Sequence, residues 1–186
     1  MSYLDDSVAQ LRIFEGVIPW MYLDTRGLVT VGVGQMLAAV SAAQALPFID
    51  ANGNPVASDV ILAEYNRVAG LPMGQAPGTY RTDASPTLAA ASIDSLLMGR
   101  VQDFDQQLSA KFANYAAFPD PAKLGLLDMI YNLGPAKLFG TYPSFMGCVN
   151  NDNWTGAAGQ CNRFGPSQAR NDWTRQQFLA AAAANP

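Results

Sequence analysis

The sequence contains no histidine, only two cysteines and few charged side chains, and these absences narrow the chemistry open to it. Without histidine there is no His-based catalytic triad, no histidine metal site and no imidazole general base. Two cysteines are too few to form a thiolate cage around a metal ion. We therefore expect no metal and no cofactor, and any acid–base chemistry falls to carboxylates.

Long apolar runs and basic clusters are also missing. No stretch reaches the length that crosses a bilayer, and residues 1–12 are too acidic and polar for a secretion signal. Eleven basic side chains stand against fifteen acidic ones, which gives a formal net charge of −4 and a pI near 4.6. We therefore expect a protein made in the cytoplasm without a signal peptide, with no membrane insertion and no nucleic-acid partner.

What the chain does have is enough apolar surface for a core. Its 186 residues are typical of a single domain, and 49% of them are apolar. Periodicity and capping residues predict helices in most of the sequence, at 2–15, 37–46, 58–69, 85–112 and 120–134, with Asp152 and Ser167 as the caps of two more. Residues 70–86 are rich in glycine and proline and predict an irregular connection. The sequence thus predicts an α+β, mainly α fold.

One segment, residues 28–34, alternates strictly and predicts a β-strand. Val29 and Val31 then lie on one face of this strand, and Thr30 and Gly32 lie on the other. Glycine inside a strand often permits the close approach of a ligand or another backbone. Gly32 therefore predicts an unobstructed face beside Thr30.

Glu15, Asp24 and Thr30 all fall on this helix and hairpin and are expected to border one cleft. Glu15 shares a helical face with Leu11, so we expect it to be partly buried. Burial and the negative end of the helix dipole both favour its protonated form. Asp24, on a polar turn, should stay ionised. Glycoside hydrolysis needs such a pair, one protonated carboxyl and one ionised. A purely structural explanation is equally simple. The two carboxylates would cap a local element or lie in solvent, and Thr30 would be an ordinary strand residue.

The wider motif favours the chemical interpretation. Residues 13–16, the Tyr-x-Asp-x-x-Gly turn at 22–27 and the Thr-x-Gly-x-Gly strand at 30–34 together resemble the phage-type lysozymes, the family of the T-even phage lysozyme. Residues 124–178 resemble that family more weakly, and residues 47–110 show no resemblance. The resemblance implies a lysozyme-like fold with a small β-hairpin lobe at about 17–36 and a larger helical lobe formed by the remainder.

The resemblance also implies roles for individual residues. Glu15 would be the general acid that protonates the glycosidic oxygen, and Asp24 and Thr30 would hold a water on the opposite sugar face. Asn132 matches an amide that lines the family's cleft, and it is equally well explained as a helix C-terminal cap. Arg170 matches an arginine that approaches the catalytic Glu, or is simply a solvated arginine near a helix start. With Gly32, these two are the expected substrate-binding residues.

A muramidase acting on peptidoglycan glycan strands is therefore expected, as a monomer in the periplasm or cell wall of a target bacterium. It would be either a phage endolysin or an exported antibacterial toxin, the latter with an inhibitory immunity protein as its partner. The acidic charge and Gln35, where family members commonly have histidine, depart from the family pattern. A binding module without turnover and a lytic transglycosylase, which needs the Glu alone, stay open as alternatives.

The two cysteines are thirteen residues apart, at Cys148 and Cys161. An antiparallel arrangement of the segments that carry them would allow a disulfide, and two separate buried thiols fit the same spacing. Neither sulfur is expected to be catalytic, because no histidine is present to activate a thiolate.

Overall fold

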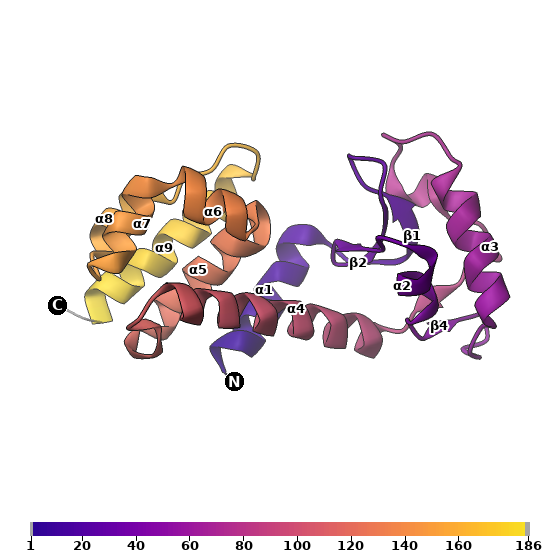
Figure 1. Ribbon diagram of the computed structural model, residues 1–186, viewed down its shortest axis with the longest axis horizontal. Helices are drawn as coiled ribbons and strands as arrows, with labels where there is room; N and C mark the ends of the chain where they lie inside the picture. The colour runs from indigo at the N-terminus through magenta and orange to yellow at the C-terminus, as the bar shows by residue number, and fades with distance from the viewer. Residues whose placement is uncertain (1, 185–186) are drawn as a thin grey trace. The chain divides into compact units, whose positions relative to one another are not determined.

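The computed structural model describes residues 2–184 and divides into two compact units. One, called here the β unit, is Glu15–Leu97. The other, called the helical unit, consists of the chain up to Phe14 together with the chain from Met98 onward. Figure 1 colours the β unit from indigo to magenta and most of the helical unit from rose to yellow. That the whole chain forms one domain stays a prediction.

The β unit is built on an antiparallel sheet with the strand order β3-β2-β1-β5-β4. Its strands are β1 (Ile18–Leu23), β2 (Val29–Gly32), β3 (Gln35–Met36), β4 (Phe48–Ile49) and β5 (Thr87–Leu88). The sheet therefore extends well past residue 36, and a β-lobe confined to about 17–36 is wrong. Strands of two residues, such as β4 and β5, are too short to show the alternation by which a strand is recognised in a sequence.

The register of the hairpin places Thr30 as expected. Thr30 pairs with Tyr22 across β1 and β2, whereas Val29 pairs with Leu23. Directly paired residues share one face of a sheet, so Thr30 lies on the Tyr22 face and Val29 on the opposite one. The predicted strand 28–34 is broken, because Val33 and Gly34 form a tight turn between β2 and β3.

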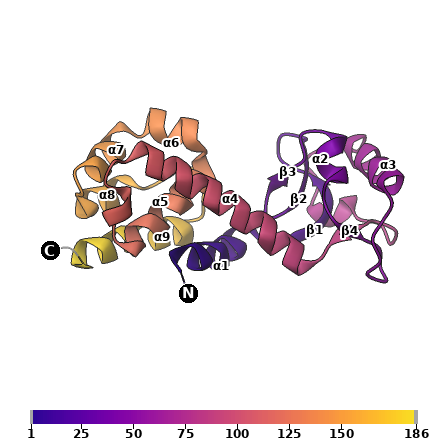
Figure 2. The ribbon, with the colours of Figure 1, turned by 60° about the horizontal axis from the view of Figure 1, so that its bottom comes forward.

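Two helices complete the β unit, α2 (Val40–Gln44) and α3 (Ser58–Ala69), and both are visible beside the strands in Figure 2. α3 packs against β1 and β2 and ends at the predicted residue, Gly70. Residues 70–86 form the expected irregular connection, except for one 3₁₀ turn, η1 (Pro77–Tyr80).

The helical unit consists of helices around a buried central one, α5 (Asp120–Leu133). The others are α1 (Tyr3–Glu15, whose last residue belongs to the β unit), α4 (Ala90–Lys111, shared by both units), η2 (Tyr115–Ala117), α6 (Pro135–Thr141), α7 (Pro143–Asn150), α8 (Trp154–Gln160) and α9 (Gln168–Ala184). α9, yellow in Figure 1, packs against both α5 and α8. None of the helices within residues 2–184 combines the length and apolar character that a membrane crossing requires.

Several predicted helix ends are correct and others are wrong, including both ends of the helix predicted at 37–46, which spans only Val40–Gln44. Ser2 and Asp5 form the expected capping box, and the Ser167 hydroxyl accepts a hydrogen bond from the Arg170 backbone N–H. The long helix α4 begins at Ala90 rather than after Ser85, because the intervening chain pairs into the sheet as β5. α8 is capped by Asn153, whose side chain accepts from Gly156 N, and not by Asp152.

A buried ion network ties α5 to α9 and to the segment between α8 and α9. The Asp128 carboxylate, 2% exposed, accepts hydrogen bonds from Arg163 at 2.6 Å and from Arg170 Nε at 2.8 Å. The Thr174 hydroxyl donates to the same carboxylate. A buried charge needs such partners because its desolvation is costly, so this cluster specifies how the helices pack.

Candidate active site

Glu15 is the last residue of α1, where the chain turns sharply into the β unit. Gly16, at φ 72°, adopts a conformation that favours glycine and ends the helix. Leu11, one turn earlier, is 2% exposed, but Glu15 itself is exposed. The expectation that Glu15 is partly buried is therefore wrong. Sharing a helical face with a buried residue does not bury a side chain at the helix end, because the packed surface ends before it.

Asp24 holds the turn between β1 and β2. Its Oδ1 accepts hydrogen bonds from the backbone N–H groups of Arg26 at 2.8 Å and Leu28 at 2.9 Å, and its Oδ2 lies 3.3 Å from the Arg26 guanidinium. Burial alone would raise the pKa of Asp24. The hydrogen bonds and the arginine outweigh burial and lower this pKa below its usual value. Asp24 is therefore ionised near neutral pH, as predicted.

Thr30 and Gly32 lie on β2 and are both buried. The Thr30 side chain is 2% exposed, and its hydroxyl donates a hydrogen bond to the Leu28 carbonyl at 3.0 Å. Gly32 has φ 69°, and a Cβ at this position would lie 3.4 Å from Ile93 Cγ2. The expectation of an unobstructed face beside Thr30 is therefore wrong, and the backbone conformation by itself accounts for glycine at position 32.

Tyr22 lies on β1, two residues before Asp24, and is half-buried. Burial raises the pKa of Tyr22, and the negative charges of Asp24 and then Glu15 raise it further. Such an effect on one phenol requires both carboxylates to lie within electrostatic reach of its ring. Within the β unit, Asp24 and Glu15 therefore both lie within electrostatic reach of the Tyr22 phenol.

A cavity of about 320 Å³ opens beside Asp24 within the β unit. Its lining comes from the end of β1 and from the irregular connection, namely Tyr22, Leu23, Asp24, Thr25, Gly74, Gln75 and Pro77. The sequence carried no signal for the lining residues of the connection, Gly74, Gln75 and Pro77, because nothing in it indicated where the connection folds back.

Asn132 and Arg170 belong to the helical unit. Asn132 is exposed one residue before the end of α5, and Gly134, at φ 75°, is the C-cap, so the alternative that Asn132 caps the helix is wrong. The Arg170 side chain is 7% exposed, pairs with Asp128 and lies with its guanidinium 5.0 Å from the centre of the Phe14 ring. The alternative of a solvated arginine is therefore wrong as well. A substrate-binding role for either residue stays a prediction.

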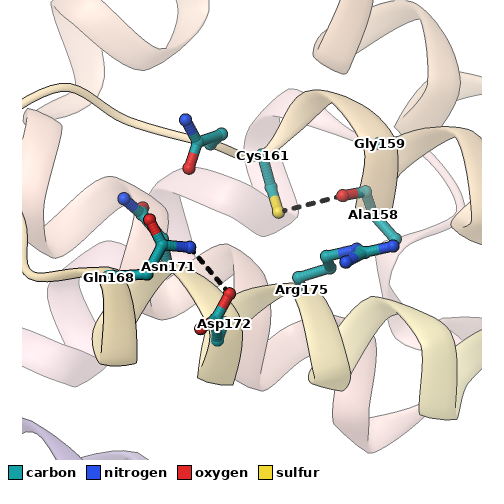
Figure 3. Close-up of a pocket in the computed structure, with 8 residues that line it drawn as sticks. Ala158, Gly159, Cys161, Gln168, Asn171, Asp172 and Arg175 are labelled. Carbon is teal, nitrogen blue, oxygen red and sulfur yellow. Dashed lines mark hydrogen bonds between the residues drawn. The ribbon is translucent and has the colours of Figure 1, made fainter.

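A second cavity, of about 410 Å³, lies between α8 and the start of α9 (Figure 3). The Cys161 thiol forms part of it and donates to the Ala158 carbonyl, while Gln168 donates to Asp172 at the rim. Cys148 and Cys161 are free thiols, so the disulfide alternative is not realised. Burial raises the pKa of Cys161, which disfavours the reactive thiolate.

Comparisons with known proteins identify the fold. No protein-family model matches the chain, and no curated protein matches it. A crystal structure of a mutant P22 lysozyme superposes with a TM-score of 0.58 at 19% identity, over 96% of this chain and 99% of that one. An endolysin from the Escherichia coli O157:H7 phage FAHEc1 superposes with a TM-score of 0.52 at 16% identity, over 99% of this chain and 95% of that one. The chain therefore has the lysozyme-like α+β fold of the phage lysozymes, as its helix–turn–strand motif predicted.

Proposed function

We propose that this protein is a muramidase that hydrolyses the β-1,4 bond between N-acetylmuramic acid and N-acetylglucosamine in peptidoglycan. The observation that carries the proposal is the placement of Glu15 at the end of α1 and of Asp24 on the turn between β1 and β2, both in the β unit of a chain with the fold of phage lysozymes. An endolysin and an exported antibacterial effector would both act on this bond, at the periplasm or cell wall of the target.

The two carboxyl groups divide the reaction between them. Glu15, in its protonated form, donates its proton to the glycosidic oxygen as the bond to the anomeric carbon breaks. Asp24, held ionised by its turn, accepts a proton from a water whose oxygen attacks the opposite face of that carbon. The products are a new reducing end with inverted configuration and a free hydroxyl on the departing sugar.

Four other residues have proposed supporting roles. Thr30 would help to hold the water from the Tyr22 face of the sheet, and Gly32 would let the glycan approach β2. Within the helical unit, substrate binding by the exposed amide of Asn132 and by the ion-paired Arg170 stays a proposal that rests on the family resemblance alone.

The Glu15→Gln variant tests the role of the acid. The amide keeps the shape of the side chain but cannot donate a proton to the leaving oxygen, so turnover of purified peptidoglycan should fall on the order of 10²-fold or more. Asp6→Asn is the matched control, because Asp6 is also an exposed carboxylate on α1. Circular dichroism and the melting temperature verify that both variants are folded.

Lysis by Glu15→Gln at the wild-type rate would contradict the assignment of the acid. Wild-type protein that binds glycan strands and releases no product would instead support a binding module without turnover.

The structure also supports a second candidate, a lytic transglycosylase. This reaction needs a Glu acid but no positioned water, and the Thr30 hydroxyl is buried and already donates to Leu28. Mass spectrometry of the products separates the two candidates. A muramidase yields reducing ends, whereas a transglycosylase yields anhydro ends that are lighter by one water.

A further inference from the structure

The irregular connection between α3 and β5 is fastened to the β unit at two points. The Trp20 indole N–H donates to the Pro77 carbonyl at 2.9 Å, which ties the connection to β1. The Tyr80 hydroxyl, on a side chain only 1% exposed, donates to the Pro72 carbonyl at 2.9 Å and accepts from the Gln75 backbone N–H at 3.4 Å. These bonds fix the backbone on both sides of Gln75.

A half-buried ion pair supports the same region from α3. Arg67 pairs with Glu64 at 2.7 Å and also donates to the Tyr80 carbonyl, and Ser85 donates to Glu64. Glycine- and proline-rich connections are usually irregular because few contacts restrain them. Here the connection is restrained by side chains of α3, of β1 and of its own Tyr80. It therefore forms an ordered wall of the cavity beside Asp24.

That cavity combines apolar and hydrogen-bonding surfaces. Tyr22, Leu23 and Pro77 contribute apolar surface, and Asp24 is the proposed water-holding carboxylate. The Gln75 side chain is exposed, and its amide makes no hydrogen bond to any other residue between 2 and 184. This amide is therefore free to serve a ligand.

The lining suits one class of ligand, an N-acetylated sugar ring. A pyranose presents an apolar face that packs on aromatic and aliphatic side chains, and an acetamido group presents one N–H donor and one carbonyl acceptor. A glutamine amide offers the complementary acceptor and donor. The volume, about 320 Å³, lies at the lower end of small-molecule sites.

We propose that this cavity is a subsite for an N-acetylated sugar of the glycan strand and that Gln75 recognises its acetamido group. The proposal rests on the muramidase function for its substrate class. Gln75 lies in the stretch 47–110, where the sequence shows no resemblance to phage-type lysozymes, so the assignment comes from this chain's own residues.

Two variants of the full-length protein test the subsite. Gln75→Ala removes the amide, and Thr79→Ala is the control, because Thr79 is exposed in the same connection but does not line the cavity. Loss of one or two hydrogen bonds should raise KM for peptidoglycan about three- to tenfold in Gln75→Ala and leave kcat unchanged. Thr79→Ala should behave as wild type. A fall in kcat with unchanged KM would overturn the subsite.

A binding measurement separates this proposal from the muramidase function. An oligomer of N-acetylglucosamine is titrated against its de-acetylated counterpart, with detection by nuclear magnetic resonance of the inactive Glu15→Gln variant. We expect tighter binding of the acetylated oligomer, and we expect the added Gln75→Ala change to abolish that preference.

The outcomes are distinguishable. Hydrolysis of peptidoglycan together with an unchanged preference in the Gln75→Ala background would overturn the subsite and leave the muramidase intact. A preference that depends on Gln75 in a protein without turnover would uphold the subsite and overturn the muramidase. A protein that neither binds nor hydrolyses would overturn both.

Discussion

At the scale of single residues, Asp24 shows how one carboxylate can serve both folding and chemistry. Its Oδ1 accepts two backbone N–H groups of the turn, which is a structural role sufficient to explain an aspartate here. The same bonds keep the group ionised, which is the state that a water-holding carboxylate needs. The Tyr-x-Asp-x-x-Gly motif therefore encodes the turn and the charge together.

The lowered pKa of Asp24 predicts a specific pH dependence of stability. Because an unfolded aspartate has a pKa of about 3.9, the unfolded chain takes up this proton before the folded protein does as the pH falls. The stabilisation from Asp24 is thus fully present above about pH 5 and is lost below about pH 4. The melting-temperature difference between wild type and Asp24→Asn should therefore be largest near neutral pH and shrink towards pH 2.

The exposed Asp103 on α4 supplies the control, since Asp103→Asn removes the same charge from a carboxylate with no hydrogen-bond partner among residues 2–184. Its melting temperature should stay close to that of the wild type across the range. Melting curves of Asp24→Asn that run parallel to the wild type at every pH would refute the linkage.

At the scale of elements, the contact between α5 and α9 depends on a residue without a side chain. A Cβ at Gly125 of α5 would lie 2.7 Å from the tip of the Phe178 ring of α9. That ring is fully buried and packs edge-on against Phe145, at 5.4 Å between centroids, and parallel to Trp154. It has no room to retreat, so the two helices approach this closely only with glycine at 125.

We therefore expect Gly125→Ala to destabilise the protein although alanine is the better helix former. The gain in helix propensity is about 1 kcal/mol, and overpacking of a tight core costs about 1–3 kcal/mol. Urea unfolding should show a lower midpoint with an unchanged slope. Gly99→Ala is the matched control, because a Cβ at Gly99 of α4 meets nothing within 4 Å, and it should be neutral or stabilising by up to about 1 kcal/mol. Equal effects of the two substitutions would contradict the packing argument.

At the scale of the whole molecule, the net charge of −4 sets how the protein meets its proposed substrate. The negatively charged protein and the carboxylates of peptidoglycan repel each other. Salt screens this repulsion, because the Debye length falls from about 30 Å at 0.01 M to about 10 Å at 0.1 M. The initial rate on intact cell-wall sacculi should thus rise at least about twofold between these salt concentrations.

Sacculi whose carboxylates have been converted to amides are the control substrate, and their rate of hydrolysis should be insensitive to salt over the same range. A rate on sacculi that falls as salt is added would show instead that attraction brings the protein to the wall.

The local sequence was sufficient for most features that depend on neighbouring residues. The capping box at Ser2, the end of α3 at Gly70, the end of α5 at Gly134 and the face on which Thr30 lies were all predicted correctly, because caps, stops and alternation are set within a few residues. The helix–turn–strand motif extended this to the fold, which the solved phage lysozymes confirm.

Features that depend on distant residues required the folded chain. The exposure of Glu15, the pairing of β4 with β5 and the burial of Arg170 against Asp128 each depend on segments far apart in sequence, and the predictions failed there. The cavity beside Asp24 is the clearest case, since Trp20 holds Pro77 across 57 residues. Such contacts form only when burial of the whole core makes up for the entropy of closing long loops, and no short pattern records which segments then meet.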